Sequence, residues 1–100
     1  MISKIINGNI LVFRISEKGE IGSLNIPGDV KNFVADMTKV DISMVNMIKK
    51  NLIKFGKSIN KGTFVVVSQY DFEEELNIVP TMQEAFDFIE MEEIERQLNF

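Results

Sequence analysis

Residues 32–67 carry the pattern that most restricts the fold of this chain. Two short apolar runs, at residues 33–35 and 64–67, stand on either side of a segment with helical periodicity. Continuous apolar runs of this length are typical of strands that are covered on both faces, or that run parallel beside a helix. The pattern therefore predicts a strand, a helix and a second strand, for which a right-handed crossover is strongly favoured.

The predicted helix lies within residues 41–61 and has one apolar side. Placed at about 100° per residue, its apolar side chains fall within one arc: Met44, Val45, Met47, Ile48, Leu52, Phe55 and Ile59. A lysine stripe on another side consists of Lys50, Lys54, Lys57 and Lys61. Asp41 or Ser43 can accept an unpaired backbone N–H at the helix start. Gly62 stands where a glycine can end the helix.

Two parts of the chain resemble a known family. Asp36-Met37-Thr38-Lys39-Val40 looks like a D-L-S-x-V strand end, and residues 76–85 look like a final strand followed by the start of a last helix. Together with the helix and the apolar run between them, these segments resemble the core of STAS domains, the sulfate-transporter and anti-sigma-factor-antagonist family. The resemblance covers roughly half of the chain, and it implies a regulatory domain that binds another protein.

The chain departs from this family at the phosphorylated motif. Family antagonists carry D-S/T-S-G-L at the start of the central helix, and the second hydroxyl residue accepts the phosphate. Counted without gaps from Asp36, the motif falls on residues 44–48 and places Asn46, which cannot be phosphorylated, at the acceptor position. A shifted alignment uses Asp41 and Ser43, but it requires a gap and lacks the glycine. Two family helices, between the early strands and before the last strand, have no counterpart in the pattern.

Composition excludes several kinds of chemistry. The 100 residues include no cysteine and no histidine, so the chain has no disulfide, no thiolate ligand and no imidazole base. With 45% hydrophobic and 26% charged residues, the profile is that of one globular domain over residues 1–100. The net charge is −4, and residues 51–100 hold 4 basic and 10 acidic side chains. An acidic chain of this kind is a poor nucleic-acid binder.

The apolar run at residues 10–13 is short and is followed by Arg14. This argues against a signal peptide, and no run in the sequence approaches the length of a membrane span. We therefore expect a cytoplasmic protein that does not bind a membrane.

The N-terminal third predicts a hairpin followed by a loop. Asn7-Gly8 stands between two apolar segments, and this is a strong hairpin signal because both residues tolerate positive φ. Residues 16–30 are rich in turn formers and predict no helix, with a short strand possible at residues 23–26. They contain no phosphate-loop motif.

Further along, residues 69–75 predict a solvated acidic turn in which Tyr70 and Phe72 cover the core.

The C-terminal residues predict a helix with two apolar patches. Thr81 and Glu84 form a capping box, and the helix runs to about Gln97. One face holds Met82, Ala85, Phe86 and Ile89, and the roughly opposite face holds Met91, Ile94 and Leu98. The second patch, with Phe100, has no obvious partner within the chain and indicates an interaction surface. Alternatively, the helix bends after Glu90 and its tail folds onto the domain.

These patterns together predict a two-layer α/β domain that resembles a shortened STAS fold. A mixed sheet of four or five strands is expected to carry the central and C-terminal helices on one face. The predicted function is non-enzymatic, because Ser43 and Ser68 have no histidine to activate them.

The resemblance implies a regulatory protein similar to the anti-sigma-factor antagonists. Its partner is another protein, such as an anti-sigma-like regulator, or a second copy in a homodimer, and we expect no metal and no cofactor. If the family's contact surface persists at the helix start, it consists of Asp41, Ser43, Asn46 and Met47. The C-terminal patch adds Met91, Ile94 and Leu98. Two alternatives are a small-ligand module, in which residues 19–28 help to hold a nucleotide or lipid, and a homo-oligomeric structural module.

Overall fold

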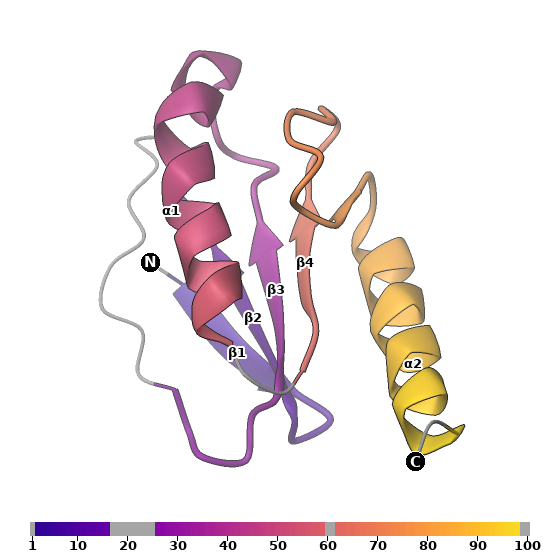
Figure 1. The fold of residues 1–100 in the computed structure, drawn as a ribbon. Coiled ribbons are helices and arrows are strands. Elements are labelled where there is room, and N and C mark those ends of the chain that lie inside the picture. The colour runs from indigo at the N-terminus through magenta and orange to yellow at the C-terminus, as the bar shows by residue number, and fades with distance from the viewer. Residues whose placement is uncertain (1, 17–25, 60–61, 99–100) are drawn as a thin grey trace.

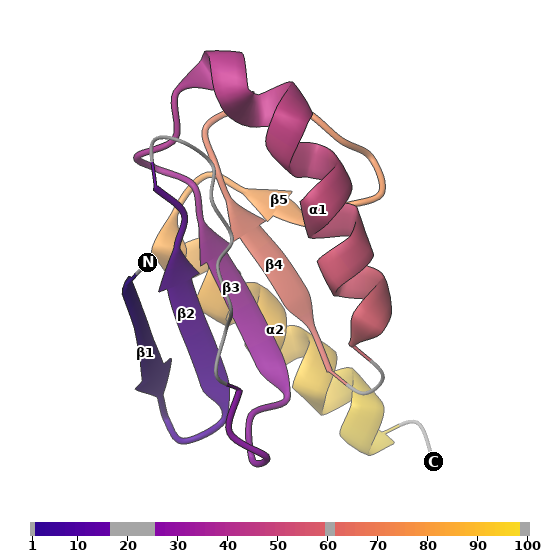
Figure 2. The same cartoon turned by 90° about the vertical axis from the view of Figure 1, so that its left-hand side faces the viewer.

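The computed structural model describes residues 2–16, 26–59 and 62–98, which form a five-stranded sheet and two main helices (Figure 1). In chain order the elements are β1 (Ile2–Ile6), β2 (Ile10–Arg14), β3 (Asn32–Asp36), the 3₁₀ turn η1 (Ile42–Met44), α1 (Val45–Ser58), β4 (Phe64–Val67), β5 (Ile78–Val79) and α2 (Met82–Leu98). The strands follow sequence order across the sheet (Figure 2). The predicted α/β class, with a mixed sheet and two main helices, is confirmed.

The first two strands form the antiparallel hairpin that Asn7-Gly8 predicts. Asn7 has a φ of 54° and Gly8 a φ of 77°, the left-handed conformation that these two residue types tolerate. From β2 onward, neighbouring strands run parallel. The parallel strands therefore all begin near one edge of the sheet and end near the opposite edge.

Each helix covers a different face of this sheet. α1 buries Ile48 and Leu52 in one apolar core, and α2 buries Ala85 and Ile89 in a second core on the other face. The two helices accordingly flank the sheet in Figure 1. The prediction that both helices lie on one face is wrong. β3 and β4 are buried at every position, so the side chains on both of their faces need cover, and one helix cannot provide it.

Four phenylalanines fill the core beneath α1. The ring centroid of Phe55 lies 5.0 Å from that of Phe64, 5.4 Å from Phe33 and 5.5 Å from Phe13. These tilted and edge-on arrangements are favoured between aromatic rings. The neighbouring Gly56 allows α1 to approach β4 closely, because a Cβ at that position would lie 3.2 Å from the Phe64 ring.

The two ends of α1 differ from the sequence prediction. The chain enters the helix through η1, which Asp41 caps by accepting the backbone N–H of Ser43 at 3.0 Å. α1 ends at Ser58, so Gly62 does not terminate it as predicted. Gly62 instead lies where a Cβ would overlap the backbone carbonyl of Lys31. Glycine is therefore required where the chain entering β4 passes the chain entering β3.

α2 is one continuous helix from Met82 to Leu98. The Thr81 hydroxyl accepts the backbone N–H of Glu84 at 3.2 Å, the forward bond of the predicted capping box. Because the helix continues past Glu90 and Met91, Ile94 and Leu98 stay exposed, the alternative in which the helix bends there and buries its apolar tail on the domain is wrong. The strand predicted at residues 23–26 lies mostly outside the described residues, and residues 26–30 hold no helix.

Candidate functional site

The parallel strands end at the edge of the sheet where α1 begins. In α/β sheets, binding sites commonly lie just outside the carboxyl ends of the strands. Here a pocket of about 180 Å³ opens between the turn after β3, the start of α1 and the segment after β4. The pocket is lined by Met37, Thr38, Val40, Ile42, Val45, Ser68, Gln69 and Tyr70.

The carboxylate of Asp36 fixes the turn after β3. Its Oδ1 accepts the Thr38 N–H at 2.9 Å and the Thr38 hydroxyl at 2.7 Å, and its Oδ2 accepts Arg14 Nε at 3.2 Å. Burial acts to raise the pKa of Asp36, but the bonds from Thr38 and then Arg14 outweigh it and hold this pKa below its ordinary value. Asp36 is therefore ionised at neutral pH, which makes it an anchor for the turn and a poor general acid.

The four residues predicted at the helix start lie together on one exposed surface: Asp41, Ser43, Asn46 and Met47. Hydrogen bonding from the backbone N–H and then the side chain of Ser43 holds the pKa of Asp41 below its ordinary value. The sequence placed Met47 in the apolar arc of the helix, yet its side chain is 60% exposed. The arc that the sheet covers is narrower than the predicted one and is centred on Ile48 and Leu52.

Two further side chains beside these four are exposed, and the sequence patterns did not predict their exposure. Ile42 is 57% exposed, and because it stands in η1, the periodicity of α1 does not report on it. Tyr70 was predicted to cover the core, but it is 47% exposed. Its backbone N–H donates to the buried Ser68 hydroxyl at 3.1 Å. Phe72, by contrast, does pack against the core beneath α1. We call Asp41, Ile42, Ser43, Asn46, Met47 and Tyr70 the α1-start surface.

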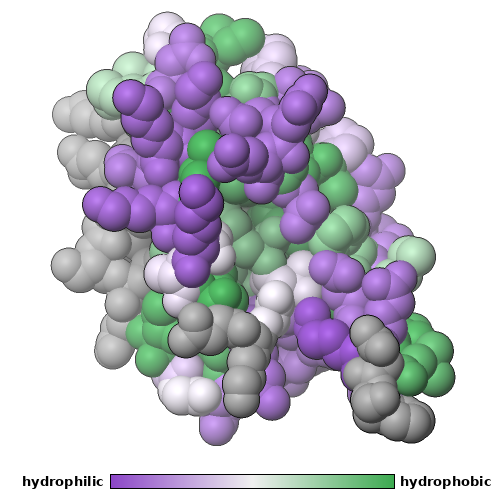
Figure 3. Space-filling view, in the orientation of Figure 1, coloured by the Kyte–Doolittle hydropathy of each residue, from purple (hydrophilic) through white to green (hydrophobic). Residues whose placement is uncertain are grey.

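A second apolar surface lies on the outer side of α2, near its C-terminus. Met91 is 63% exposed, Ile94 48% and Leu98 72%. In the space-filling view, apolar surface appears at the C-terminal end of α2, whereas hydrophilic side chains dominate over α1 (Figure 3). The three residues predicted to form an exposed patch are therefore exposed, while Phe100 lies outside the described residues.

A network of polar side chains, which we call the polar latch, holds this end of α2 to the sheet. The Glu93 carboxylate accepts Nδ2 of Asn32 at 2.6 Å and Nδ2 of Asn9 at 3.1 Å. Arg96 donates to the Thr63 hydroxyl at 2.8 Å and to Asn32 Oδ1 at 3.3 Å. Asn32 Oδ1 also accepts the Thr63 N–H at 3.1 Å. Asn32 has no exposed surface, so the latch satisfies a polar group that is buried at the start of β3.

The polar latch was not predicted, although the sequence holds a signal for it. Asn9, Asn32 and Thr63 each stand directly before an apolar strand run. Parallel strands begin at the same edge of a sheet, so polar residues at the starts of β2, β3 and β4 come to lie close together, although Asn32 pairs with Ile10 and not with Asn9. The partners Glu93 and Arg96 are three residues apart and therefore share one side of α2.

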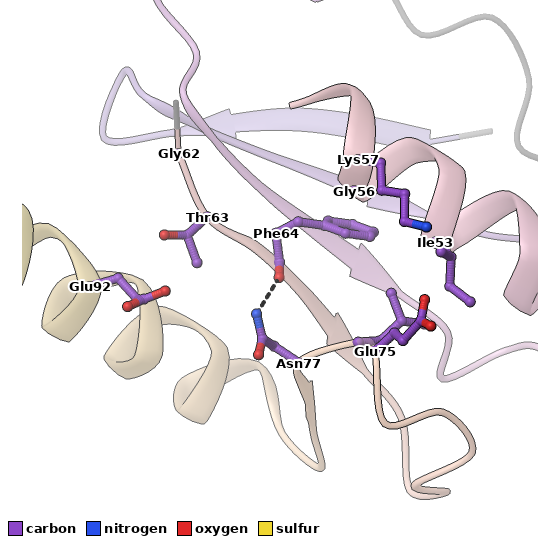
Figure 4. A pocket seen from close by; sticks show the side chains of 10 residues that line it. Ile53, Gly56, Lys57, Gly62, Thr63, Phe64, Glu75, Asn77 and Glu92 are labelled. Atoms are coloured by element: carbon purple, nitrogen blue, oxygen red, sulfur yellow. Dashed lines mark hydrogen bonds between the residues drawn. The ribbon is translucent and has the colours of Figure 1, made fainter. Parts of the chain in front are cut away.

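A cavity of about 520 Å³ lies between α1, β4, the segment before β5 and α2 (Figure 4). Its lining combines apolar side chains, including Phe64, with Lys57, Glu75 and Glu92. At its floor, Asn77 Nδ2 donates to the Phe64 carbonyl at 3.2 Å. The Thr63 hydroxyl in its lining is already bonded to Arg96. This arrangement provides no nucleophile with an adjacent base.

Within residues 2–16, 26–59 and 62–98, no group of three or more acidic, histidine or cysteine side chains could hold a metal ion. In the same part of the chain, no helix has the length and apolar character needed to cross a membrane.

Comparisons of the chain with protein-family models, with curated proteins and with solved structures found no match. The resemblance to STAS domains therefore stays a prediction from the sequence.

Proposed function

We propose that this chain is a non-enzymatic protein-recognition domain that binds another protein through the α1-start surface, in the manner of an anti-sigma-factor antagonist. The observation that carries the proposal is the exposure of Ile42 and Met47 on the turns that open α1. Protein-binding patches usually have an apolar centre surrounded by a polar rim. Asp41, Ser43 and Asn46 supply the polar groups around the two apolar side chains.

The size of the pocket at this surface favours a protein over a small ligand. Pockets that enclose small molecules usually measure about 300–1,000 Å³, and the pocket beside Ile42 and Tyr70 measures about 180 Å³. A pocket of this size suits one inserted side chain of a partner. The rigid anchoring of the preceding turn by Asp36 also supports recognition of a folded partner, because the surface is ordered before binding.

The test compares two asparagine substitutions on the same helix. Asn46→Arg introduces a large charged side chain into the α1-start surface, whereas Asn51→Arg introduces it at another exposed position of α1. Tagged wild-type and variant proteins are used to capture partners from the native lysate, and the captured proteins are quantified by mass spectrometry. We expect a specific partner that Asn46→Arg loses and Asn51→Arg retains, with unchanged circular dichroism for both variants. Recovery of the same partners by all three proteins would contradict the proposal.

A second candidate function is the binding of an apolar ligand. A separate cavity of about 400 Å³ has mainly apolar walls, with Lys31 and Ser58 among its lining residues. Its apolar residues are Ile26, Val30, Phe33, Phe55 and Ile59. This chemistry favours a lipid-like chain over a nucleotide. Titration with a fluorescent fatty acid tests the idea, and saturable binding that Ile26→Arg abolishes is the expected result.

A further inference from the structure

The outer side of α2 has the spacing of a helix-pairing surface. Met91, Ile94 and Leu98 follow one another at intervals of three and four residues, the spacing by which two helices pack along a shared seam. All three side chains are exposed, although they belong to the same helix that buries Ala85 and Ile89. The domain uses one side of α2 and leaves an apolar seam on the other. We call these three residues the α2 seam.

The polar latch fixes the direction in which the seam points. Glu93 and Arg96 lie between the seam residues in sequence but turn toward the sheet, where they bond to Asn32. Rotating α2 to bury the seam would break these bonds and leave the buried Nδ2 of Asn32 without the Glu93 carboxylate as its acceptor. The seam is therefore held outward as part of the folded state.

The charges beside the seam are negative. At about 100° per residue, Glu90 lies along one border of the seam and Glu95 along the other, and both are exposed. Asp87 continues the line of the seam one turn earlier. The one cation of α2 is Arg96, and its guanidinium bonds to the Thr63 hydroxyl and to Asn32. The outward side of the helix is thus an apolar seam between two carboxylates.

We infer that the α2 seam binds an amphipathic helix of another protein, one that carries lysine or arginine on both sides of an apolar stripe. Apolar residues of such a helix pack along the seam, and its cations meet Glu90 and Glu95, as in helix pairs whose flanking charges select the partner. This surface is separate from the α1-start surface of the proposed function.

A second copy of this chain fits the seam less well. Its α2 would bring the same carboxylates opposite each other, which is unfavourable. Its α1 offers Lys50, Lys54 and Lys57 on the exposed side, but apart from Met47 the most apolar part of that helix is buried against its own sheet. Neither helix of a second copy supplies an apolar stripe between cations.

The test uses two synthetic helical peptides of about 20 residues, long enough to hold helical structure. Both carry leucine at the seam positions, and they differ only in having lysine or glutamate at the flanking positions. Binding to the full chain is measured by fluorescence anisotropy at low and high salt. We expect the lysine peptide to bind at least about tenfold more tightly than the glutamate peptide, with a preference that weakens as salt screens the charges.

Three variants locate the binding site. Ile94→Asp should weaken the lysine peptide by at least about tenfold, and the double variant Glu90→Lys with Glu95→Lys should shift the preference toward the glutamate peptide. Ile5→Asp, the same change at a β1 side chain that is 46% exposed and belongs to neither proposed surface, should leave the affinity unchanged. Circular dichroism and thermal unfolding check that each variant is folded. Equal binding of both peptides, unchanged affinity for Ile94→Asp, or wild-type self-association that Ile94→Asp abolishes would each overturn the inference.

Discussion

α1 and α2 pack on opposite faces of one sheet, yet they divide their apolar side chains differently. Apart from Met47, α1 turns its apolar residues toward a single core and presents lysines and other polar side chains to the solvent. α2 has apolar residues on two sides, and the sheet covers only one of them. The apolar pattern of α1 is explained almost entirely by folding. Folding explains only part of the apolar pattern of α2, because it does not account for the α2 seam.

The largest expected loss of stability comes from truncating a buried side chain in either helix. Comparing the two losses tests whether both helices contribute equally to the core. Leu52 of α1 has no exposed surface and Ile89 of α2 is 2% exposed. Truncating either one to alanine should lower the free energy of unfolding by about 2–5 kcal/mol, because a buried cavity is left behind. Urea unfolding followed by circular dichroism measures both variants. A loss confined to Leu52→Ala would mean that α2 is only loosely attached to its face of the sheet.

A smaller effect is expected at the polar latch. Asn32→Ala removes one of the partners of Glu93, one of the partners of Arg96, and the side-chain acceptor of the Thr63 N–H. Leaving buried polar groups unpaired should cost about 1–3 kcal/mol and loosen the last turns of α2. Hydrogen exchange with mass spectrometry should show faster exchange in residues 91–98 and unchanged exchange in α1. Asn51→Ala, at an exposed position, serves as the control and should change neither region.

The contrast between the hairpin and the latch shows what the sequence could and could not predict. The hairpin follows from Asn7-Gly8 because its turn geometry depends on adjacent residues. The Asn9–Glu93 bond joins positions 84 residues apart, so it depends on the arrangement of the whole sheet. The same limit explains the misplaced helix: apolar periodicity shows that α2 has a side to bury, but not which face of the sheet receives it.

The α1-start surface was also predictable only in part. The exposure of Asp41, Ser43 and Asn46 agrees with the predicted polar helix start, where side chains accept the unpaired backbone N–H groups of the first turn. Ile42 and Tyr70 were missed because they lie in irregular segments, where neither the helical nor the strand period applies. The positions of these two side chains depend on loop geometry, for which the sequence carries no periodic signal.

Low pH should destabilise the domain through Asp36, which anchors the turn between β3 and the start of α1. Its pKa is lowered from the ordinary value of 3.8, so the stabilisation from its bonds is complete above that value and is lost as the pH falls through the lowered pKa. Urea midpoints measured from about pH 6 to pH 2 should therefore fall less in Asp36→Asn than in the wild type, even though the variant is less stable at neutral pH. Asp71→Asn, which changes an exposed aspartate, should retain the wild-type slope.

The smallest expected effect on stability is that of an isoleucine-to-alanine substitution on the exposed side of α2. The same change at Ile89, on the buried side, belongs to the largest expected effect. Ile94→Ala should change the free energy of unfolding by no more than about 0.5 kcal/mol, because Ile94 is already 48% exposed and alanine favours a helix. Urea unfolding of Ile89→Ala and Ile94→Ala in parallel makes the comparison direct. A loss at Ile94 as large as that at Ile89 would place the tail in the core and remove the reason for a partner. Two isoleucines on one helix, one needed for folding and one not, would instead indicate that the second serves contacts beyond this domain.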